Sequence, residues 1–110
     1  MLWTIEYPYK DTEKFILALS PGLKARYFRL ADILIEFGSN LGMPHTRAMS
    51  NGLFELRLKG EEGIARVFYC TLPGKRIVIS HGFVKKTQKT PNKELRIAEH
   101  RLKEIKDNES

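Results

Sequence analysis

The sequence is poor in residues that bind metal ions. It has a single cysteine, Cys70, which cannot form an internal disulfide, and its three histidines lie far apart. No HxxxH, CxxC or DxD spacing is present, so we expect no metal site. A phosphate-binding loop and a dinucleotide-binding fingerprint are also missing, and we expect no cofactor. Cys70 lies within an apolar run, which favours a small buried side chain over a reactive thiol.

Long apolar runs are missing as well. None approaches the roughly 20 residues of a membrane-spanning helix, and the first ten residues, MLWTIEYPYK, are too polar for a signal peptide. We therefore expect a soluble, cytoplasmic protein with no membrane partner. The chain has 110 residues, of which 42% are hydrophobic and 11 are aromatic. These amounts predict one folded domain over residues 1–110 with a substantial core.

Acidic residues are scarce in one long stretch. Between Arg57 and Lys93 there are nine lysines and arginines but only two acids, Glu61 and Glu62. The net charge of this stretch, +7, exceeds the +6 of the whole chain, so the remainder is nearly neutral. A basic surplus of this kind indicates a polyanionic partner, either a nucleic acid or an acidic protein.

The first half of the chain reads as a short strand followed by two helices. Residues 2–7 alternate between two faces, and Pro8 ends this strand or places it at a sheet edge. Asp11 or Thr12 can cap a first helix, and Ser20-Pro21 begins a second helix that ends near Gly38. One face of the second helix is predicted to be buried, and it carries Leu23, Tyr27, Leu30, Leu34 and Phe37. Residues 39–52 read as a loop, in which His45 is expected to be exposed.

The second half reads as three strands and a last helix. The strands are predicted over residues 54–59, 64–72 and 76–84, and Gly82 marks a bend or a bulge in the last of them. Thr90-Pro91 then begins a helix. We expect an α+β fold: a mainly antiparallel sheet of four strands, with an N-terminal helical hairpin on one face and a C-terminal helix.

Cations gather on these predicted strands and after the last one. They are Arg57, Lys59, Arg66, Lys85, Lys86 and Lys89. Grouped cations bind phosphates, and they can also cut RNA without a metal ion, because RNA carries its own nucleophile, the 2′-hydroxyl. A lysine with a lowered pKa can serve as the base, and arginines can hold the phosphoryl oxygens of the transition state. A solvated strand face and solubilising lysines would give the same pattern, so the charges alone leave the choice open.

Two runs in the second half resemble a known family. GLFELRLKGEEGIARVFYC and RIVISHGFVKKTQKTPNKELRIAEHR are similar to the phage-derived branch of the RelE/HigB toxin superfamily, and the order of elements expected above matches its fold. The resemblance implies the toxin of a type II toxin–antitoxin pair, an endoribonuclease that cuts mRNA on the translating ribosome without a metal. It also implies an antitoxin with a helix-turn-helix domain.

The same resemblance assigns roles to the basic residues. Arg57, in the ELR piece, and Arg66, in the RVFY piece, fall at positions where the family has phosphate-binding and catalytic cations. The residues that we expect to be catalytic are Arg57, Arg66 and Lys86, and those that we expect to bind RNA are Lys59, His81, Lys85 and Lys89.

Two positions depart from the family pattern. Ala65 replaces an aromatic residue, and the segment KKTQKT lacks the tyrosine that stacks on a base in many relatives. His81, Phe83 or Tyr69 could stack instead, although Tyr69 and Phe83 are better interpreted as core residues. The rival hypothesis is a non-catalytic binding module of the same fold, which pairs only with a helix-turn-helix regulator or with nucleic acid.

Overall fold

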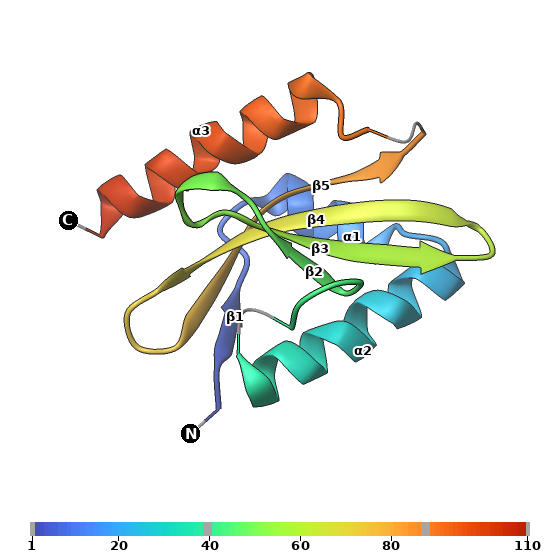
Figure 1. Ribbon diagram of the computed structural model, residues 1–110, viewed down its shortest axis with the longest axis horizontal. Coiled ribbons are helices and arrows are strands. Elements are labelled where there is room, and N and C mark those ends of the chain that lie inside the picture. Colours follow the sequence, from blue (N-terminus) through green and yellow to red (C-terminus); the bar gives the residue numbers. More distant parts are fainter. Residues whose placement is uncertain (1, 39–40, 87–88, 110) are drawn as a thin grey trace.

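The computed structural model describes residues 2–38, 41–86 and 89–109 (Figure 1). The helices and strands of these ranges follow one another as β1 (Thr4–Glu6), α1 (Lys10–Leu17), α2 (Pro21–Phe37), β2 (Thr46–Ala48), a short 3-10 turn (Ser50–Gly52), β3 (Phe54–Gly60), β4 (Gly63–Leu72), β5 (Arg76–Lys85) and α3 (Asn92–Asn108). None of these helices is both long enough and apolar enough to span a bilayer.

Five strands of the described chain form one sheet in the order β1-β5-β4-β3-β2. β1 runs parallel to β5, and every other neighbouring pair is antiparallel. The predicted α+β fold with a mainly antiparallel sheet is therefore confirmed, but the predicted number of four strands is wrong. The extra strand, β2, lies in the segment that reads as a loop. Three residues are too few to show an alternating pattern, and β2 exists because it pairs with β3, with Arg47 opposite Glu55.

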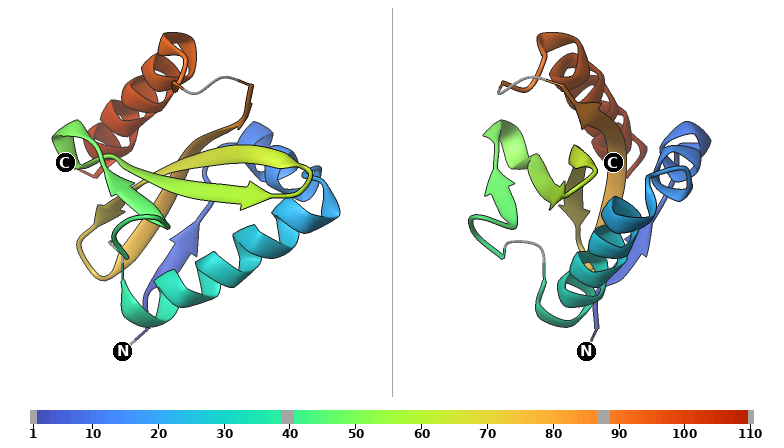
Figure 2. Two further views of the ribbon diagram at one scale, coloured as in Figure 1. Left: turned by 45° about the vertical axis from the view of Figure 1, so that its right-hand side comes forward. Right: turned by 90° about the vertical axis from the view of Figure 1, so that its right-hand side faces the viewer.

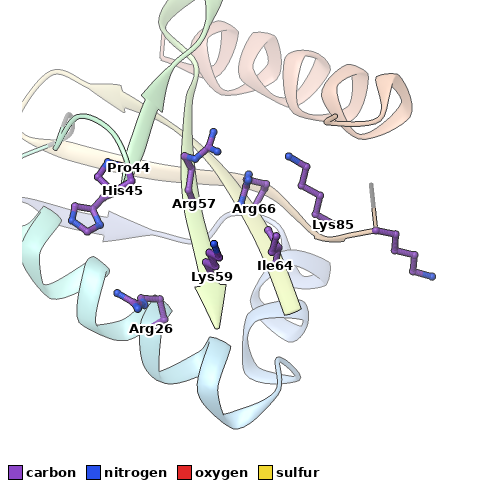
Figure 3. A pocket seen from close by; sticks show the side chains of 9 residues that line it. Arg26, Pro44, His45, Arg57, Lys59, Ile64, Arg66 and Lys85 are labelled. Carbon is purple, nitrogen blue, oxygen red and sulfur yellow. The ribbon is translucent and has the colours of Figure 1, made fainter. Parts of the chain in front are cut away.

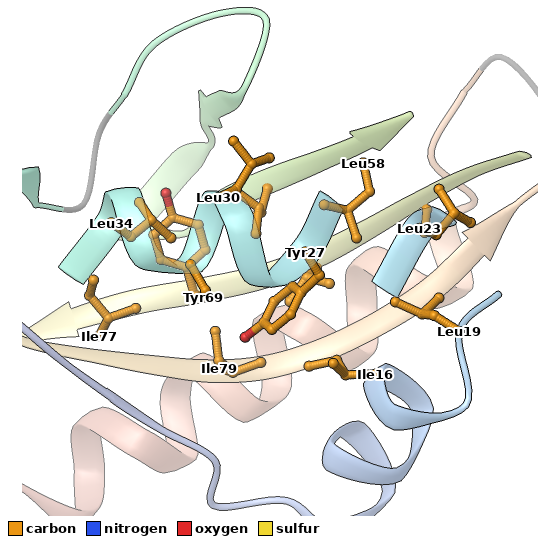
Figure 4. Packing of buried hydrophobic residues seen from close by; sticks show 14 residues of the cluster. Ile16, Leu19, Leu23, Tyr27, Leu30, Leu34, Leu58, Tyr69, Ile77 and Ile79 are labelled. Carbon is orange, nitrogen blue, oxygen red and sulfur yellow. The ribbon is translucent and has the colours of Figure 1, made fainter. Parts of the chain in front are cut away.

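Helices cover both faces of the sheet (Figure 2). As predicted, α1 and α2 pack on one face. Their buried side chains meet alternate residues of β3, β4 and β5 in a core that includes Ile16, Leu23, Tyr27, Leu30, Leu34, Leu56, Leu58, Val67, Tyr69, Ile77 and Ile79 (Figure 4). On the other face α3 encloses a second, smaller core of Leu53, Phe68, Cys70, Leu72, Val78, Phe83, Ala98, Leu102 and Ile105. Cys70, Tyr69 and Phe83 are core residues, as expected.

The predicted burial of Phe37 is wrong, and so is a bulge at Gly82, the second of the two roles considered for that glycine. Phe37, the last residue of α2, is 71% exposed, because the chain leaves the helix at Gly38 with φ of +101° before the helix can carry this ring over the core. The bulge of β5 lies at Ser80 and not at Gly82, since His81 pairs with Phe68 while Ile79 pairs with Tyr69. Gly82 has another role. A Cβ atom there would lie 2.7 Å from the ring of Phe15, so the glycine lets this α1 residue lie against β5.

Arg101 ties α3 to the N-terminal part of the chain. Its guanidinium bonds both carboxylate oxygens of Asp11, at 3.1 and 2.8 Å, and also donates to the Thr12 hydroxyl and to the Ser80 carbonyl. It lies over the ring of Tyr9, 4.2 Å from its centroid. One side chain of α3 therefore connects the segment before α1, α1 itself and the bulge of β5.

We expect Arg101→Ala to lower the free energy of unfolding by about 1–3 kcal/mol, because the Thr12 hydroxyl and the Ser80 carbonyl lose a charged donor. Equilibrium unfolding in urea measures this change. Arg96→Ala, at an exposed position on the same helix, is the matched control and should change stability by no more than about 0.5 kcal/mol.

The same variant should respond to pH. The hydrogen bonds from Arg101 lower the pKa of Asp11. The stability that this carboxylate contributes is therefore present above the ordinary aspartate pKa of about 3.9, and it is lost as the pH falls through the lower pKa of the folded state. The difference between wild type and Arg101→Ala should shrink toward low pH. A difference that stays constant or grows would contradict the assigned role.

Candidate functional site

α3 covers only part of its face of the sheet, and a basic cleft of about 740 Å³ opens beside it (Figure 3). Six of the nine residues that line the cleft are lysines or arginines, and none is acidic. The lining consists of Arg26, Pro44, His45, Arg57, Lys59, Ile64, Arg66, Lys85 and Lys86. Five of the seven predicted site residues therefore come together here.

The strand register brings the basic side chains to one face. β3 and β4 are antiparallel, and Arg57 pairs directly with Arg66. Ile64, two residues before Arg66, pairs with Lys59 on one side and with Lys85 on the other. Residues paired across a ladder point to the same face of a sheet. Like charges opposite each other destabilise a sheet, so the Arg57–Arg66 pair requires a compensating negative charge.

Glu55 supplies that charge, and it was not among the predicted site residues. It is 1% exposed and lies two residues before Arg57 on the same face of β3. Its Oε1 accepts a hydrogen bond from Arg57 Nη1 at 3.4 Å and lies 3.5 Å from Arg66 Nε. Its Oε2 accepts the hydroxyl proton of Thr90 at 3.0 Å. The sequence signal was the ELR triplet, in which an acid and an arginine share a strand face.

Arg66 lies on the floor of the cleft and is 4% exposed. Its Nη1 donates to the Ala65 carbonyl at 3.1 Å, whereas its Nε makes no hydrogen bond within the described part of the chain. Burial and the nearby charge of Arg57 lower the pKa of Arg66, and Glu55 opposes this shift. An arginine remains charged after such a shift, so the floor of the cleft holds a fixed cation.

Lys85 ends β5 at the edge of the cleft. Burial lowers the pKa of its amine, and the positive charges of Arg66, Arg57 and Arg47 lower it further, while Glu55 opposes them. A lowered pKa raises the share of the neutral amine, which is the form of a lysine that can act as a base. Lys59 and Lys86 are exposed and line the same cleft.

His45 reaches the cleft from the segment before β2. Its carbonyl accepts a hydrogen bond from the backbone N–H of Arg57 at 2.8 Å, which continues the ladder between β2 and β3. The sequence predicts an exposed loop histidine, and His45 is exposed. What the sequence does not reveal is the short β2 pairing that carries this residue to the site. Among the lining residues, all of which lie in the described ranges, His45 alone has an aromatic ring.

Two predicted site residues lie outside the cleft lining. His81 is held against α3, where its Nε2 lies 2.8 Å from Glu94 Oε1, and its ring is parallel to that of Phe68. Lys89 is an exposed residue in the segment that leads to α3. The segment KKTQKT includes residues 87 and 88, which lie outside the described ranges.

The arrangement suits the binding of a phosphate group. Two opposed guanidinium groups and a lysine converge on one face, and guanidinium groups bind phosphate oxygens through paired hydrogen bonds. Within residues 2–38, 41–86 and 89–109, no three His, Cys, Asp or Glu side chains come together as a metal site would require. The donors on hand for an anion are therefore the nitrogen atoms of the lining side chains.

Known proteins share both sequence features and the fold. The model of a family described as phage-derived protein Gp49-like (DUF891) matches residues 14–103. A mutant of the Escherichia coli toxin RelE, solved in the free state, is similar with a TM-score of 0.62 and 12% sequence identity, over 96% of this chain and 99% of that chain. No curated protein matches the sequence. The RelE structure shows a shared fold across nearly the whole chain.

Proposed function

We propose, from the premise that this chain belongs to the family of phage-derived Gp49-like proteins, that it is the toxin of a type II toxin–antitoxin pair and cuts mRNA without a metal ion. The fold that it shares with the RelE toxin supports this proposal. The observation that carries it is the basic cleft, in which Arg57 and Arg66 face each other beside Lys85 with no acid among the lining residues.

The proposed reaction is an intramolecular phosphoryl transfer, in which the phosphorus exchanges its bond to the 5′-oxygen for a bond to the 2′-oxygen. The neutral Lys85 amine removes the proton of a 2′-hydroxyl, and the 2′-oxygen attacks the adjacent phosphorus. Arg57 and Arg66 stabilise the negative charge that develops on the phosphoryl oxygens. The bond from phosphorus to the 5′-oxygen breaks, and Lys86 or Lys59 donates a proton to the leaving oxygen. The products are a 2′,3′-cyclic phosphate and a 5′-hydroxyl.

The lowered pKa of Lys85 and its place on the face of Arg57 and Arg66 support this residue as the general base. His45 is the lining residue best suited to stack on a nucleobase of the RNA, because no other of the described lining residues has an aromatic ring. We place the reaction on the translating ribosome in the cytoplasm, where mRNA is threaded through a fixed path. Whichever of Lys59 and Lys86 does not donate the proton contacts a flanking phosphate, and Lys89 extends that surface toward α3.

A non-catalytic binding module is the second candidate function, and one observation favours it. Arg66 is 4% exposed, so little of its guanidinium is accessible to a phosphate while its side chain lies against Glu55. In such a module the exposed cations of the cleft would only attract a polyanion or a regulator. Cleavage by the purified protein distinguishes the two candidates.

The chemistry of the products tests the mechanism. We expect cleaved mRNA with a 2′,3′-cyclic phosphate or 3′-phosphate and a 5′-hydroxyl, because the nucleophile belongs to the RNA. An mRNA with a single 2′-deoxynucleotide at the mapped cut site is the matched control and should remain intact there. Free mRNA in excess EDTA should still be cut if ribosomes are dispensable. Products with a 3′-hydroxyl and a 5′-phosphate, or cleavage of the deoxy substrate, would exclude this mechanism.

Substitution of Arg66 separates catalysis from general attraction. Arg66→Ala should reduce cleavage on the order of a hundred- to a thousand-fold, which is typical for the loss of one preorganised donor in a transition state, and it should abolish growth arrest on induction. Lys14→Ala, an exposed cation of α1 outside the cleft, should remain as toxic as wild type. Thermal melting controls for folding, and Arg66→Lys serves if the alanine variant is unstable. A folded Arg66→Ala protein with full toxicity would contradict the assignment.

A neutralising partner is the third expectation, because free toxin would stop growth of the host. We expect the product of an adjacent gene, with a helix-turn-helix domain, to co-purify with this chain and to relieve growth arrest. An acidic segment that covers the basic cleft should associate more slowly as salt is raised. Harmless overexpression of the folded protein would favour the binding module.

A further inference from the structure

Glu55 is enclosed beneath the basic cleft, where substrate cannot contact it. Its side chain is 1% exposed, and it is not among the residues that line the cleft. Both carboxylate oxygens already face protein donors, Arg57 and Arg66 on one side and Thr90 on the other. A charge is retained inside a protein only with such partners. Its function therefore concerns the groups that it holds.

We propose that Glu55 is a positioning residue, which aims the guanidinium groups of Arg57 and Arg66 at one phosphate and sets the electrostatic environment of Lys85. The inference rests on the proposed function, since positioning matters only if a phosphate reacts in the cleft. The inference adds Glu55, which does not contact the RNA, and assigns it a measurable effect on Lys85, which does.

The strand register makes the positioning necessary. Arg57 and Arg66 pair directly across β3 and β4, so without an anion the two guanidinium groups repel each other and turn apart. The same oxygen of Glu55 lies 3.4 Å from Arg57 Nη1 and 3.5 Å from Arg66 Nε. Glu55 Oε1 thus holds both guanidinium groups close together at the floor of the cleft.

The contact with Arg66 leaves that side chain able to respond to substrate. Arg66 Nε is buried and has no hydrogen-bond partner in the described ranges, although Glu55 Oε1 is 3.5 Å away. Charge attraction without a formed hydrogen bond keeps the guanidinium beside Glu55 and fixes its orientation less tightly than a hydrogen bond would. Glu55 therefore stands in for the substrate's charge while the cleft is empty.

Thr90 fixes the orientation of the carboxylate. Its hydroxyl donates to Glu55 Oε2 at 3.0 Å, and Thr90 lies just before α3. The carboxylate is thus held by two separate segments, its own strand β3 and the segment that enters α3. This double support gives the rigidity that a positioning group needs.

The charges around Lys85 come from three strands. Arg66 faces it from β4, Arg57 and Glu55 from β3, and Arg47 from β2. The three arginines lower the pKa of Lys85, and Glu55 is the one acid that raises it among the groups acting on this lysine. Removal of the Glu55 charge must therefore lower the pKa of Lys85 further.

The first measurement needs no RNA. Side-chain NMR titration of labelled lysines follows Lys85, with the exposed Lys14 as an internal reference. We expect the Lys85 pKa to fall in Glu55→Gln, to return toward the wild-type value in Glu55→Asp, and to stay unchanged in Glu36→Gln. Glu36 is a suitable control because it is an exposed carboxylate of α2, ten residues and about 15 Å along the helix from Arg26.

The second measurement is the pH profile of RNA cleavage. In Glu55→Gln we expect kcat to fall on the order of a hundred-fold, because a misaligned donor costs about that much. KM should stay equal or decrease, since the cleft loses a negative charge and no cation. The limb of the profile that rises with pH should move to lower pH, and Glu55→Asp should restore its position. Thr90→Val, which removes a single hydrogen bond, should show a smaller fall in kcat.

The outcomes distinguish this inference from the proposed function. An unchanged Lys85 pKa in a folded Glu55→Gln protein overturns the inference, as does a fall in kcat with no shift of the pH profile. If wild type cuts no RNA but the Lys85 pKa responds as expected, the ribonuclease function fails while the charge arrangement stands. If Glu55→Gln does not fold, the Thr90→Val protein decides the matter, and an unchanged kcat in that variant overturns the inference.

Discussion

Repulsion between two guanidinium groups is the constraint on which the open part of the sheet depends. The register of β3 and β4 places Arg57 opposite Arg66, and the carboxylate of Glu55 lies between them at 3.4 and 3.5 Å. A sheet selected for stability alone would place an acid or an apolar residue at one of these positions. Proteins depart from such local rules mainly where function demands it. The departure here coincides with the floor of the basic cleft.

The position of α3 divides its face of the sheet into an apolar part and a basic part. Phe68 lies at the boundary, and its ring is nearly parallel to those of His81 and Phe83 on β5, at centroid distances of 6.5 and 6.0 Å. On one side of it the helix buries the second core, and on the other side the cations remain open. Arg101 and the contact between His81 and Glu94 hold the helix in this position. The apolar part supplies the hydrophobic core of this face, and the buried charges of Glu55 and Arg66 lie beside it under the cleft.

The sequence predicts most of the fold because its long elements have strong periods. Alternation in β3 indicates that Arg57 and Lys59 share a face, and they do line one cleft. The sequence does not predict the short β2 strand, because the strand forms by pairing with β3 and three residues are too few to indicate that pairing. His45 was consequently assigned to a plain loop. Glu55 was missed for a related reason: on a strand that alternates, an acid looks like a solvated side chain until a partner strand buries it.

The parallel pairing of β1 with β5 has a consequence for the order in which the molecule can be made. Thr4 lies opposite Arg76, so the first strand finds its neighbour about 70 residues later in the chain. Contacts this distant form late, because the intervening segment must be gathered first. During synthesis on the ribosome, β1 has no partner until β5 has emerged. Lys85 ends that same strand. When β5 forms, after every other strand has been made, the nascent chain therefore completes both the sheet and the part of the cleft that Lys85 lines.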